Sequence, residues 1–268
     1  MDAFEHKCGR LRARLRELES VAVAFSGGVD SSVLLHAAHS ELGARCAAVI
    51  ADSPSLPRRE LEEARALCRS IGARLQVVAT DELDDPRYSA NRGDRCYFCK
   101  SALFDRMAPW AQEHGFRALA FGEITDDLRD DRPGARAAAE RGVVAPLREA
   151  GFAKGDVRRY ARAAGLPVAD KPASACLASR IPAGSEVTRA GLATVEAAEE
   201  ALRALGLREL RVRHLGQRAR VEVGPDELPR ARDLRAEIER LLGGLGFRTI
   251  EMAEYRPAGG ARRAGRPG

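Results

Sequence analysis

A chain of 268 residues is long enough for one large domain, or for a medium domain and a small one. Hydrophobic residues make up 45% of the chain and charged residues 31%, which excludes a disordered or collagen-like protein. The net charge of +5 is spread along the chain and gives little reason to expect a nucleic-acid partner. No apolar run is long enough to cross a membrane, and the N-terminus lacks the apolar core of a signal peptide, so we expect a cytoplasmic protein.

Short apolar runs alternate with amphipathic segments through the first two thirds of the chain. This pattern predicts strands over 21–25, 47–51, 74–79 and 118–121. It predicts helices over 30–42, 58–71, 96–114 (kinked or restarted at Pro109) and 154–164. We expect an active-site loop with a short helix over 125–150 and a further loop over 171–186. Strands that alternate with helices predict an α/β fold, a doubly wound parallel sheet with helices on both faces.

The pattern changes after residue 187. A helix is predicted over 188–205, with Thr188 as its N-cap, followed by strands over 210–214 and 219–223, a helix over 228–242 and a strand over 249–252. This order predicts a small α+β domain. We therefore expect a first domain over 1–186, a second over 187–256 and a flexible tail over 257–268.

The strongest local motif follows the first predicted strand and opens a helix. It comprises Ser26, Gly27, Gly28, Val29, Asp30, Ser31 and Ser32. Glycines let the backbone approach an anion, the first N–H groups of a helix are unpaired, and the helix dipole adds positive potential. The three serine hydroxyls can donate to phosphate oxygens, although an ordinary strand–helix turn is the alternative.

This motif lacks the Gly-Lys-Ser/Thr ending of a Walker loop, and it resembles the PP-loop of ATP pyrophosphatases. That resemblance implies an enzyme that binds ATP, transfers AMP to a substrate oxygen and releases pyrophosphate. Asp30 is a candidate Mg²⁺ ligand, or simply a favourable anion at a helix start. Asp52 ends the second strand, at the sheet edge where ligands bind, and is a candidate adenosine contact or part of a plain loop.

Six cysteines are too few for a disulfide scaffold of this size. Cys46 and Cys68 lie in apolar patterns and are expected to be buried. Cys96 and Cys99 form a Cys-x-x-Cys pair at a predicted helix start, and Cys176 lies in a loop of small residues. Three thiolates are able to hold a [4Fe–4S] cluster with one open iron; a redox pair plus a nucleophile and a zinc site are the alternatives.

The whole set of motifs resembles the LarE family, ATP-dependent sulfur transferases of nickel-pincer nucleotide biosynthesis. The resemblance covers about residues 10–256 and rests on five stretches, 24–31, 95–100, 131–134, 170–182 and 211–214. It implies that the substrate is pyridinium-3,5-biscarboxylic acid mononucleotide, whose two carboxylates become thiocarboxylates in two cycles. It also implies a homo-oligomer without a membrane partner.

In this family the cysteine that matches Cys176 is the sulfur site. Members with that cysteine alone give up its sulfur and retain dehydroalanine. Members with three cysteines are expected to bind a [4Fe–4S] cluster that delivers added sulfide. The resemblance therefore implies that Cys96, Cys99 and Cys176 hold a cluster and that a sulfide donor supports repeated turnover.

Charged residues complete the predicted site. Arg211 and Arg213 share one face of a strand and suit the phosphate of a mononucleotide, although a solvated strand face is the alternative. Arg180 is a candidate partner for a thiolate or a phosphate. Among the carboxylates that follow the fourth strand, Asp127 is a candidate Mg²⁺ ligand. The others, Asp126, Asp130 and Asp131, together with Glu200 and Glu222, are weaker candidates.

The chain also departs from the family pattern. Gly122-Glu123-Ile124-Thr125 stands where the family has Gly-Thr-Asn-x, which places the nucleotide contacts near the fourth strand in question. Ala183 stands where the family has Tyr, which is expected to enlarge the pocket. The C-terminal segment lacks the usual family ending, which leaves no role assigned to Arg256.

Two other classes of function are compatible with the PP-loop. One is a tRNA-thiolating or amide-forming enzyme: the former requires salt-sensitive RNA binding, and the latter requires ammonia delivery, for which no glutaminase segment is visible. The other is a nucleotide-binding sensor without catalysis. Release of pyrophosphate that depends on a carboxylated pyridinium substrate would exclude this class.

Overall fold

The computed structural model describes residues 2–129, 133–172 and 175–255. The chain divides into two compact units, Met1–Cys176 and Leu177–Gly268. This division lies before the boundary that we predicted at residue 186. Among the described helices, none has the length and apolar character that crossing a membrane requires.

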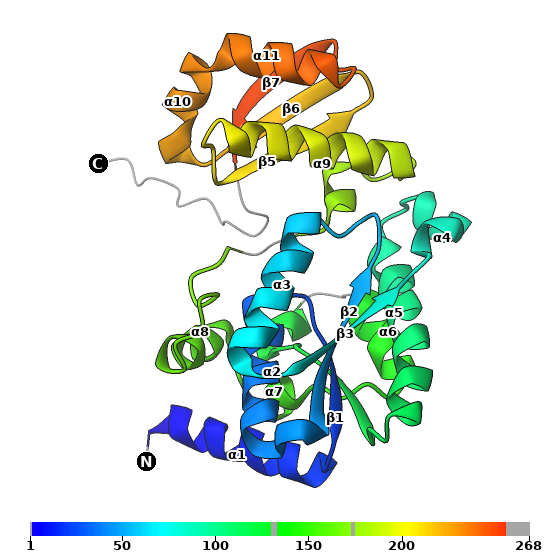
Figure 1. Cartoon of the computed structure of the whole chain (residues 1–268), viewed down its shortest axis with the longest axis vertical. Coiled ribbons are helices and arrows are strands. Elements are labelled where there is room, and N and C mark those ends of the chain that lie inside the picture. The colour runs from blue at the N-terminus through cyan, green and yellow to red at the C-terminus, as the bar shows by residue number, and fades with distance from the viewer. Residues whose placement is uncertain (1, 130–132, 173–174, 256–268) are drawn as a thin grey trace. The chain divides into compact units, whose positions relative to one another are not determined.

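A parallel sheet forms the centre of the first unit (Figure 1). Its strands are β1 (Val21–Ala24), β2 (Cys46–Asp52), β3 (Arg74–Ala79) and β4 (Ala118–Phe121). Their order is β3-β2-β1-β4, and each neighbouring pair is parallel. The predicted α/β class and the four strand positions are therefore confirmed.

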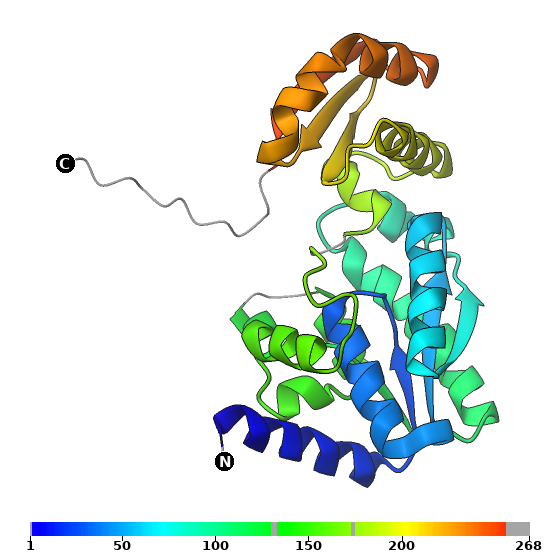
Figure 2. The same ribbon diagram turned by 60° about the vertical axis from the view of Figure 1, so that its left-hand side comes forward.

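Helices flank this sheet. The longer ones are α1 (Ala3–Leu18), α2 (Val29–Leu42), α3 (Arg58–Ile71), α5 (Arg95–Glu113) and α8 (Lys154–Ala163). The shorter ones are α4 (Pro86–Ser89), α6 (Pro133–Glu140) and α7 (Pro146–Glu149), with 3₁₀ turns η1 (Gly43–Arg45), η2 (Glu82–Asp84) and η3 (Thr125–Arg129). Figure 2 shows α1, α2 and α8 grouped on one side of the sheet.

The two faces of β1 pack into different apolar clusters. Val21 and Val23 join the cluster formed with α1, α2, α3 and α8. Ala22 and Ala24 join the cluster formed with Leu103, Phe104 and Met107 of α5. Because side chains alternate along a strand, a strand covered on both faces is a continuous apolar run, which is why β1 was recognisable in the sequence.

Three features of the first unit differ from the predictions. The amphipathic helix α1 was not predicted. Helix α5 continues through Pro109 without a restart, because its packed apolar face outweighs the one hydrogen bond that proline removes. The segment 125–150 contains η3, α6 and α7 rather than one short helix, and Val144 pairs with Ala120 beside β4.

The second unit has the predicted α+β order. It begins with η4 (Leu177–Arg180) and continues with α9 (Arg189–Ala204), β5 (Leu210–Leu215), β6 (Arg218–Val223), η5 (Pro225–Glu227), α10 (Leu228–Asp233), α11 (Arg235–Gly244) and β7 (Thr249–Glu254). The single helix predicted over 228–242 is two helices, separated at Leu234. Strand β5 is antiparallel to β6, and β6 is parallel to β7. Alternate residues of the three strands pack against α9 and α11 in a separate apolar core.

The strand order of the first unit fixes where its ligand site lies. The chain passes from β1 to β2 on one side, whereas β4 lies on the other side of β1. In open parallel sheets this change of direction leaves a crevice beyond the carboxyl ends of the two strands. The Ser26–Ser32 motif follows β1, and Gly122 follows β4, so both meet at that crevice.

Candidate functional site

The loop after β1 is organised by its own hydroxyl groups. The backbone N–H of Ser26 donates to Ser31 Oγ at 3.2 Å, and the Ser26 and Ser31 hydroxyls lie 3.1 Å apart. Gly27 has a φ of 70°, in the left-handed region that favours glycine. Gly28 is the N-cap of α2 and offers no side chain to the first N–H groups of the helix. The loop therefore presents backbone donors at a helix N-terminus, where an anion is favoured.

Gly122 brings the end of β4 against this helix start. A Cβ at Gly122 would lie 2.7 Å from the Ser31 nitrogen and 2.9 Å from the Asp30 carbonyl carbon. Both are backbone atoms, which no change of rotamer can move aside. Only glycine permits this approach, which closes one wall of the crevice.

A cavity of about 470 Å³ lies at this point. It is lined by Ala24, Ser26, Gly28, Asp30, Ser31, Cys96, Lys100, Phe121, Gly122, Glu123, Asp127, Pro133, Gly134 and Ala135. The structure thus brings the predicted loop and the first cysteine of Cys-x-x-Cys to one cavity. A nucleotide-sized space beside a helix N-terminus is suited to a ligand that carries phosphates.

Two predicted loop contacts lie outside this lining. Ser32 is fully buried, and its hydroxyl donates to the Gly28 carbonyl at 2.7 Å. Gly27 packs against Ala64 of α3. Asp52 forms an ion pair with Arg58 at 2.5 Å and is also absent from the lining. The ligand contacts proposed for these three residues stay predictions.

The carboxylates around the cavity have defined partners. Both oxygens of Asp30 accept hydrogen bonds from Lys154 Nζ, at 2.9 and 2.8 Å. Asp126 Oδ2 accepts from the backbone N–H of Lys154 at 2.6 Å, and Asp127 Oδ2 accepts from that of Ile124 at 3.1 Å. Asp126 thus anchors the start of α8, whereas Asp30 and Asp127 line the cavity. Two carboxylates and the phosphates of a ligand are a usual ligand set for Mg²⁺.

Glu123 lies in the cavity wall. It is buried and forms an ion pair with Arg148 at 2.5 Å. This pairing offsets part of the cost of burying the Glu123 carboxylate. Asp130 and Asp131 lie outside the described residues.

The three predicted cysteines lie in the first unit. Cys96 is exposed, and Cys99 and Cys176 are partly buried. Burial, followed by the negative charge of Glu82, raises the pKa of Cys99 to about 12, and the thiols of Cys176 and Cys96 act in the same direction. The Cys99 thiol therefore interacts electrostatically with the thiols of Cys96 and Cys176, and it is protonated at physiological pH.

Tyr88 marks the same neighbourhood. Burial raises its pKa, and the charges of Cys176, Cys99 and Glu82 add to that shift. The Tyr88 hydroxyl lies 2.6 Å from Ser55 Oγ, which donates to Glu82 Oε1 at 3.2 Å. Sequence reasoning missed this buried polar group close to Cys99 and Cys176, because its members are far apart in the chain.

The described residues contain no group of three or more His, Cys, Asp or Glu side chains that is able to hold a metal ion. The thiols of Cys96, Cys99 and Cys176 are suitable donors for an iron–sulfur cluster, and Cys99 interacts with both others. The donor chemistry thus fits a cluster, although the thiols are not assembled as a ligand set.

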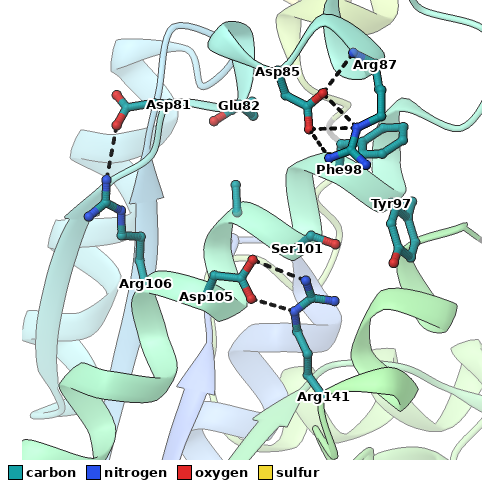
Figure 3. A pocket seen from close by; sticks show the side chains of 11 residues that line it. Asp81, Glu82, Asp85, Arg87, Tyr97, Phe98, Ser101, Asp105, Arg106 and Arg141 are labelled. Atoms are coloured by element: carbon teal, nitrogen blue, oxygen red, sulfur yellow. Dashed lines mark hydrogen bonds and ion pairs between the residues drawn. The ribbon is translucent and has the colours of Figure 1, made fainter.

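A second cavity, of about 430 Å³, borders a different face of α5 (Figure 3). Its three arginines are each paired with an aspartate: Arg106 with Asp81 at 3.2 Å, Arg87 with Asp85 at 2.7 Å and Arg141 with Asp105 at 2.7 Å. Two further lining groups, Glu82 Oε2 and Ser101 Oγ, are buried without a hydrogen-bond partner in the described structure. Because the guanidinium groups are occupied, this cavity lacks the free positive charge that a phosphate ligand requires.

In the second unit, three guanidinium groups lie near one another. Arg211 and Arg213 share a face of β5, as predicted, opposite Glu222 and Arg220 of β6. Burial lowers the pKa of Arg211, and the charges of Arg180 and Arg213 add to that shift. Arg213 pairs with Glu222 at 3.0 Å and donates to the Ser179 carbonyl at 2.8 Å. This concentration of positive charge favours an anionic ligand.

Arg180 has a structural partner that the sequence did not indicate. Its side chain is 6% exposed and donates to both oxygens of Glu199, at 2.8 and 3.2 Å. Glu199 also accepts from the Val212 backbone N–H at 3.1 Å. The Arg180 guanidinium thus holds α9 to η4, and its predicted contact with a thiolate or phosphate stays untested. Glu200, in contrast, is half exposed and contacts Arg203.

Sequence reasoning also missed Lys154. The chain has 44 lysines and arginines, of which only four are lysines (Lys7, Lys100, Lys154 and Lys171). The rarity of lysine is the one sequence signal that marks Lys154. Lys100 lines the cavity, and the other three form ion pairs with carboxylates of distant segments. Arg256, to which the sequence assigned no role, lies outside the described residues.

Comparison with known proteins connects this site to a chemistry. No family model matches the chain. It is 36% identical to the pyridinium-3,5-bisthiocarboxylic acid mononucleotide synthase of Lactiplantibacillus plantarum, over 96% of this chain and 94% of that protein. It is 44% identical to an uncharacterised protein of Synechocystis, over 84% of each chain. One component of the glutamine-hydrolysing GMP synthase of Archaeoglobus fulgidus is 28% identical over 61% of this chain and 56% of its own length.

Proposed function

Because the chain belongs to the LarE family of pyridinium-3,5-bisthiocarboxylic acid mononucleotide synthases, we propose that it is an ATP-dependent sulfurtransferase acting on pyridinium-3,5-biscarboxylic acid mononucleotide. The observation that carries this proposal is the cavity that joins the PP-loop to Cys96. In a sulfurtransferase of this kind, the nucleotide and the sulfur-bearing groups must act on the same carboxylate.

The first half-reaction is adenylation. A carboxylate oxygen of the substrate attacks the α-phosphorus of ATP, the bond to the β-phosphate oxygen breaks, and pyrophosphate leaves with the electron pair. The N–H groups at the start of α2 and the hydroxyls of Ser26 and Ser31 stabilise the phosphates, because they are fixed before ATP arrives. Asp30 and Asp127, which line the cavity, are the residues that would hold Mg²⁺, and the cation would neutralise charge on the phosphates.

The second half-reaction is sulfur transfer. Sulfide supplied by the external donor attacks the acyl carbon of the adenylate and forms the C–S bond. The C–O bond to AMP breaks, and AMP leaves with the carboxylate oxygen and the electron pair. Cys176 is the proposed site of sulfur delivery, and Arg211 and Arg213 are the proposed ligands of the substrate phosphate. Two rounds replace one oxygen of each carboxylate with sulfur. The family resemblance further supports a homo-oligomer that acts in the cytoplasm.

We propose that Cys96, Cys99 and Cys176 hold a [4Fe–4S] cluster in the loaded enzyme. A cluster held by three thiolates supplies one open iron for an external sulfide donor. Without a bound metal the pKa of Cys99 is about 12, so its thiol keeps its proton near neutral pH. Coordination of the sulfur to iron would remove that proton.

The adenylation step is tested by pyrophosphate release. Protein, ATP and Mg²⁺ are expected to release pyrophosphate only when the pyridinium mononucleotide is added. Ser31→Ala is expected to slow release roughly tenfold or more, because one hydroxyl of the phosphate site is lost. The matched control is Ser40→Ala, since Ser40 is on the same helix and its hydroxyl donates only to the His36 carbonyl. Release that depends on tRNA instead would indicate the thiolating alternative and contradict the proposal.

The cluster is tested by iron and acid-labile sulfide after anaerobic purification. We expect about four of each per chain, with loss of both in Cys99→Ala. Cys46→Ala is the matched control, because Cys46 is a buried thiol in β2 outside the site. Absence of iron, together with loss of H₂S from Cys176 after turnover, would identify Cys176 as a sacrificial donor and refute the cluster.

A further inference from the structure

Glu82 is a buried carboxylate with one oxygen that has no partner. The residue lies in η2 and is 3% exposed. Its Oε1 accepts a hydrogen bond from Ser55 Oγ at 3.2 Å, whereas Oε2 is buried without a hydrogen-bond partner in the described structure. Figure 3 shows the three aspartates of the second cavity each joined to an arginine, whereas Glu82 is joined to none. A buried carboxylate with unused bonding capacity is costly, so we infer that a further group bonds to it.

Other buried polar atoms near Glu82 in the chain share this lack of a partner. Thr80 Oγ1, Asp94 Oδ1 and Ser101 Oγ are buried without a hydrogen-bond partner in the part of the chain that the structure describes. The segment 80–101 that contains them also carries both cysteines of the Cys-x-x-Cys pair. Unused bonding capacity in the segment that bears these thiols is typical of a site that a bound group completes.

Packing places Glu82 close to Cys99. Turn η2 contacts α4 and α5, and Cys99 lies in the second turn of α5. Tyr88 of α4 supports this arrangement, because its hydroxyl lies 2.6 Å from the Ser55 Oγ that donates to Glu82. After burial, which is the largest cause, the charge of Glu82 raises the pKa of Cys99 more than Cys176 or Cys96 does. The carboxylate is thus held through one oxygen near the thiol, and its other oxygen keeps its bonding capacity.

The Glu82 carboxylate has the chemistry of an iron ligand. Carboxylate oxygens bind iron in many protein sites, although thiolates are the preferred ligands of iron–sulfur clusters. Three cysteines leave one iron of a [4Fe–4S] cluster without a protein ligand. Glu82 Oε2 has unused lone pairs, and the positive charge of a metal ion would offset part of the cost of burying the carboxylate.

We propose that Glu82 is the fourth protein ligand of the cluster, through Oε2, at the iron that Cys96, Cys99 and Cys176 leave open. This inference rests on the proposed function and deepens it. Iron holds a carboxylate less firmly than a thiolate, so this ligand is suited to a position that an external sulfide donor also uses. Because the described residues do not yet form a metal-binding group, we expect iron loading to draw Glu82 and the thiols together.

The test is anaerobic reconstitution with iron and sulfide, followed by Mössbauer spectroscopy and by the rate at which EDTA removes iron. Wild-type protein is expected to hold about four irons per chain, one of them spectroscopically distinct. Glu82→Gln keeps the side-chain shape and an acceptor for Ser55, and it is expected to lose one iron roughly tenfold faster. Glu82→Cys is expected to retain all four irons, without the distinct signal, because a thiolate then binds each iron.

Asp81→Asn is the matched control. Asp81 is the adjacent acid, but its side chain is 60% exposed and pairs with Arg106. We expect the iron content and the rate of iron loss of this variant to equal those of the wild type. Ser55→Ala is a second test that leaves the carboxylate in place. It removes only the hydrogen bond to Oε1, so it is expected to speed the loss of the same iron less than Glu82→Gln does.

The outcomes separate the ligand from the function. A Glu82→Gln variant that keeps four irons as long as the wild type does would overturn the assignment. Loss of the whole cluster from Glu82→Gln and Glu82→Cys alike would also overturn it, because that pattern indicates a structural role. Wild-type protein that takes up no iron would refute the cluster and its fourth ligand together. Wild-type protein that holds the cluster but releases no pyrophosphate with the mononucleotide would refute the proposed function and leave the ligand assignment standing.

Discussion

Substitution of Gly122 tests the link between the fold and the ATP site. In Gly122→Ala, the new Cβ would meet Ser31 N at 2.7 Å and Asp30 C at 2.9 Å, whereas ordinary contacts begin at 3.4 Å. All these atoms are backbone, so the end of β4 and the start of α2 must separate by roughly half an ångström or more. Overpacking of this kind costs about 1–3 kcal/mol. For a unit of this size, each 1 kcal/mol lowers Tm by about 2–4 °C.

The same displacement moves the N–H groups that receive phosphate. We therefore expect Gly122→Ala to weaken ATP binding roughly tenfold or more, measured by calorimetry beside thermal unfolding. Gly9→Ala is the control, because Gly9 is exposed in α1 and nothing lies within 4 Å of its added Cβ. It is expected to raise stability by up to about 1 kcal/mol and to leave ATP binding unchanged. Wild-type stability and ATP affinity in Gly122→Ala would refute the close approach of β4 to α2.

Two further predictions concern buried groups. Glu199→Ala is expected to lower the free energy of unfolding by about 3–5 kcal/mol in chemical denaturation, because it leaves Arg180 buried without its carboxylate. The control Glu200→Ala is expected to change the free energy of unfolding by less than about 0.5 kcal/mol. Similar values for both variants would contradict the buried pair. In apo protein, Cys99 is expected to react with iodoacetamide more slowly than Cys96 at pH 8, at a rate that rises up to about pH 12, as mass spectrometry can follow. Because the pKa of Cys99 in the folded protein exceeds the ordinary value of 9, the contribution of this thiol to stability is full below pH 9 and is lost as the pH rises toward 12. Equal labelling rates of Cys96 and Cys99 would contradict the raised pKa.

Local patterns were sufficient for most of the fold. Strands β1, β2 and β4 are apolar runs, because helices cover both of their faces. Strand β3 lies at the sheet edge, is only partly buried and carries Gln76 among its apolar residues. Helix α1 was missed although Phe4, Leu11 and Leu15 form an apolar stripe, since arginines and glutamates separate them. The course of α5 through Pro109 was also beyond local rules, because packing of Phe104 and Met107 on the sheet decides it.

The candidate site divides in the same way. The loop from Ser26 to Ser31 was predictable, since its glycines, serines and helix start are adjacent in sequence. The partner of Asp30 was not, because Lys154 approaches it from a helix 124 residues away. Arg180 illustrates the same limit. Its position near Cys176 in the sequence led to a prediction of anion binding, whereas its side chain pairs with Glu199 within the second unit.

The most direct test of the proposed function is mass spectrometry of substrate and protein after several turnovers with ATP, Mg²⁺ and sulfide under anaerobic conditions. The account predicts that sulfur replaces one oxygen of each carboxylate of the pyridinium mononucleotide, while Cys176 keeps its mass. A substrate that gains no sulfur while the protein binds ATP would contradict the assignment as a sulfurtransferase.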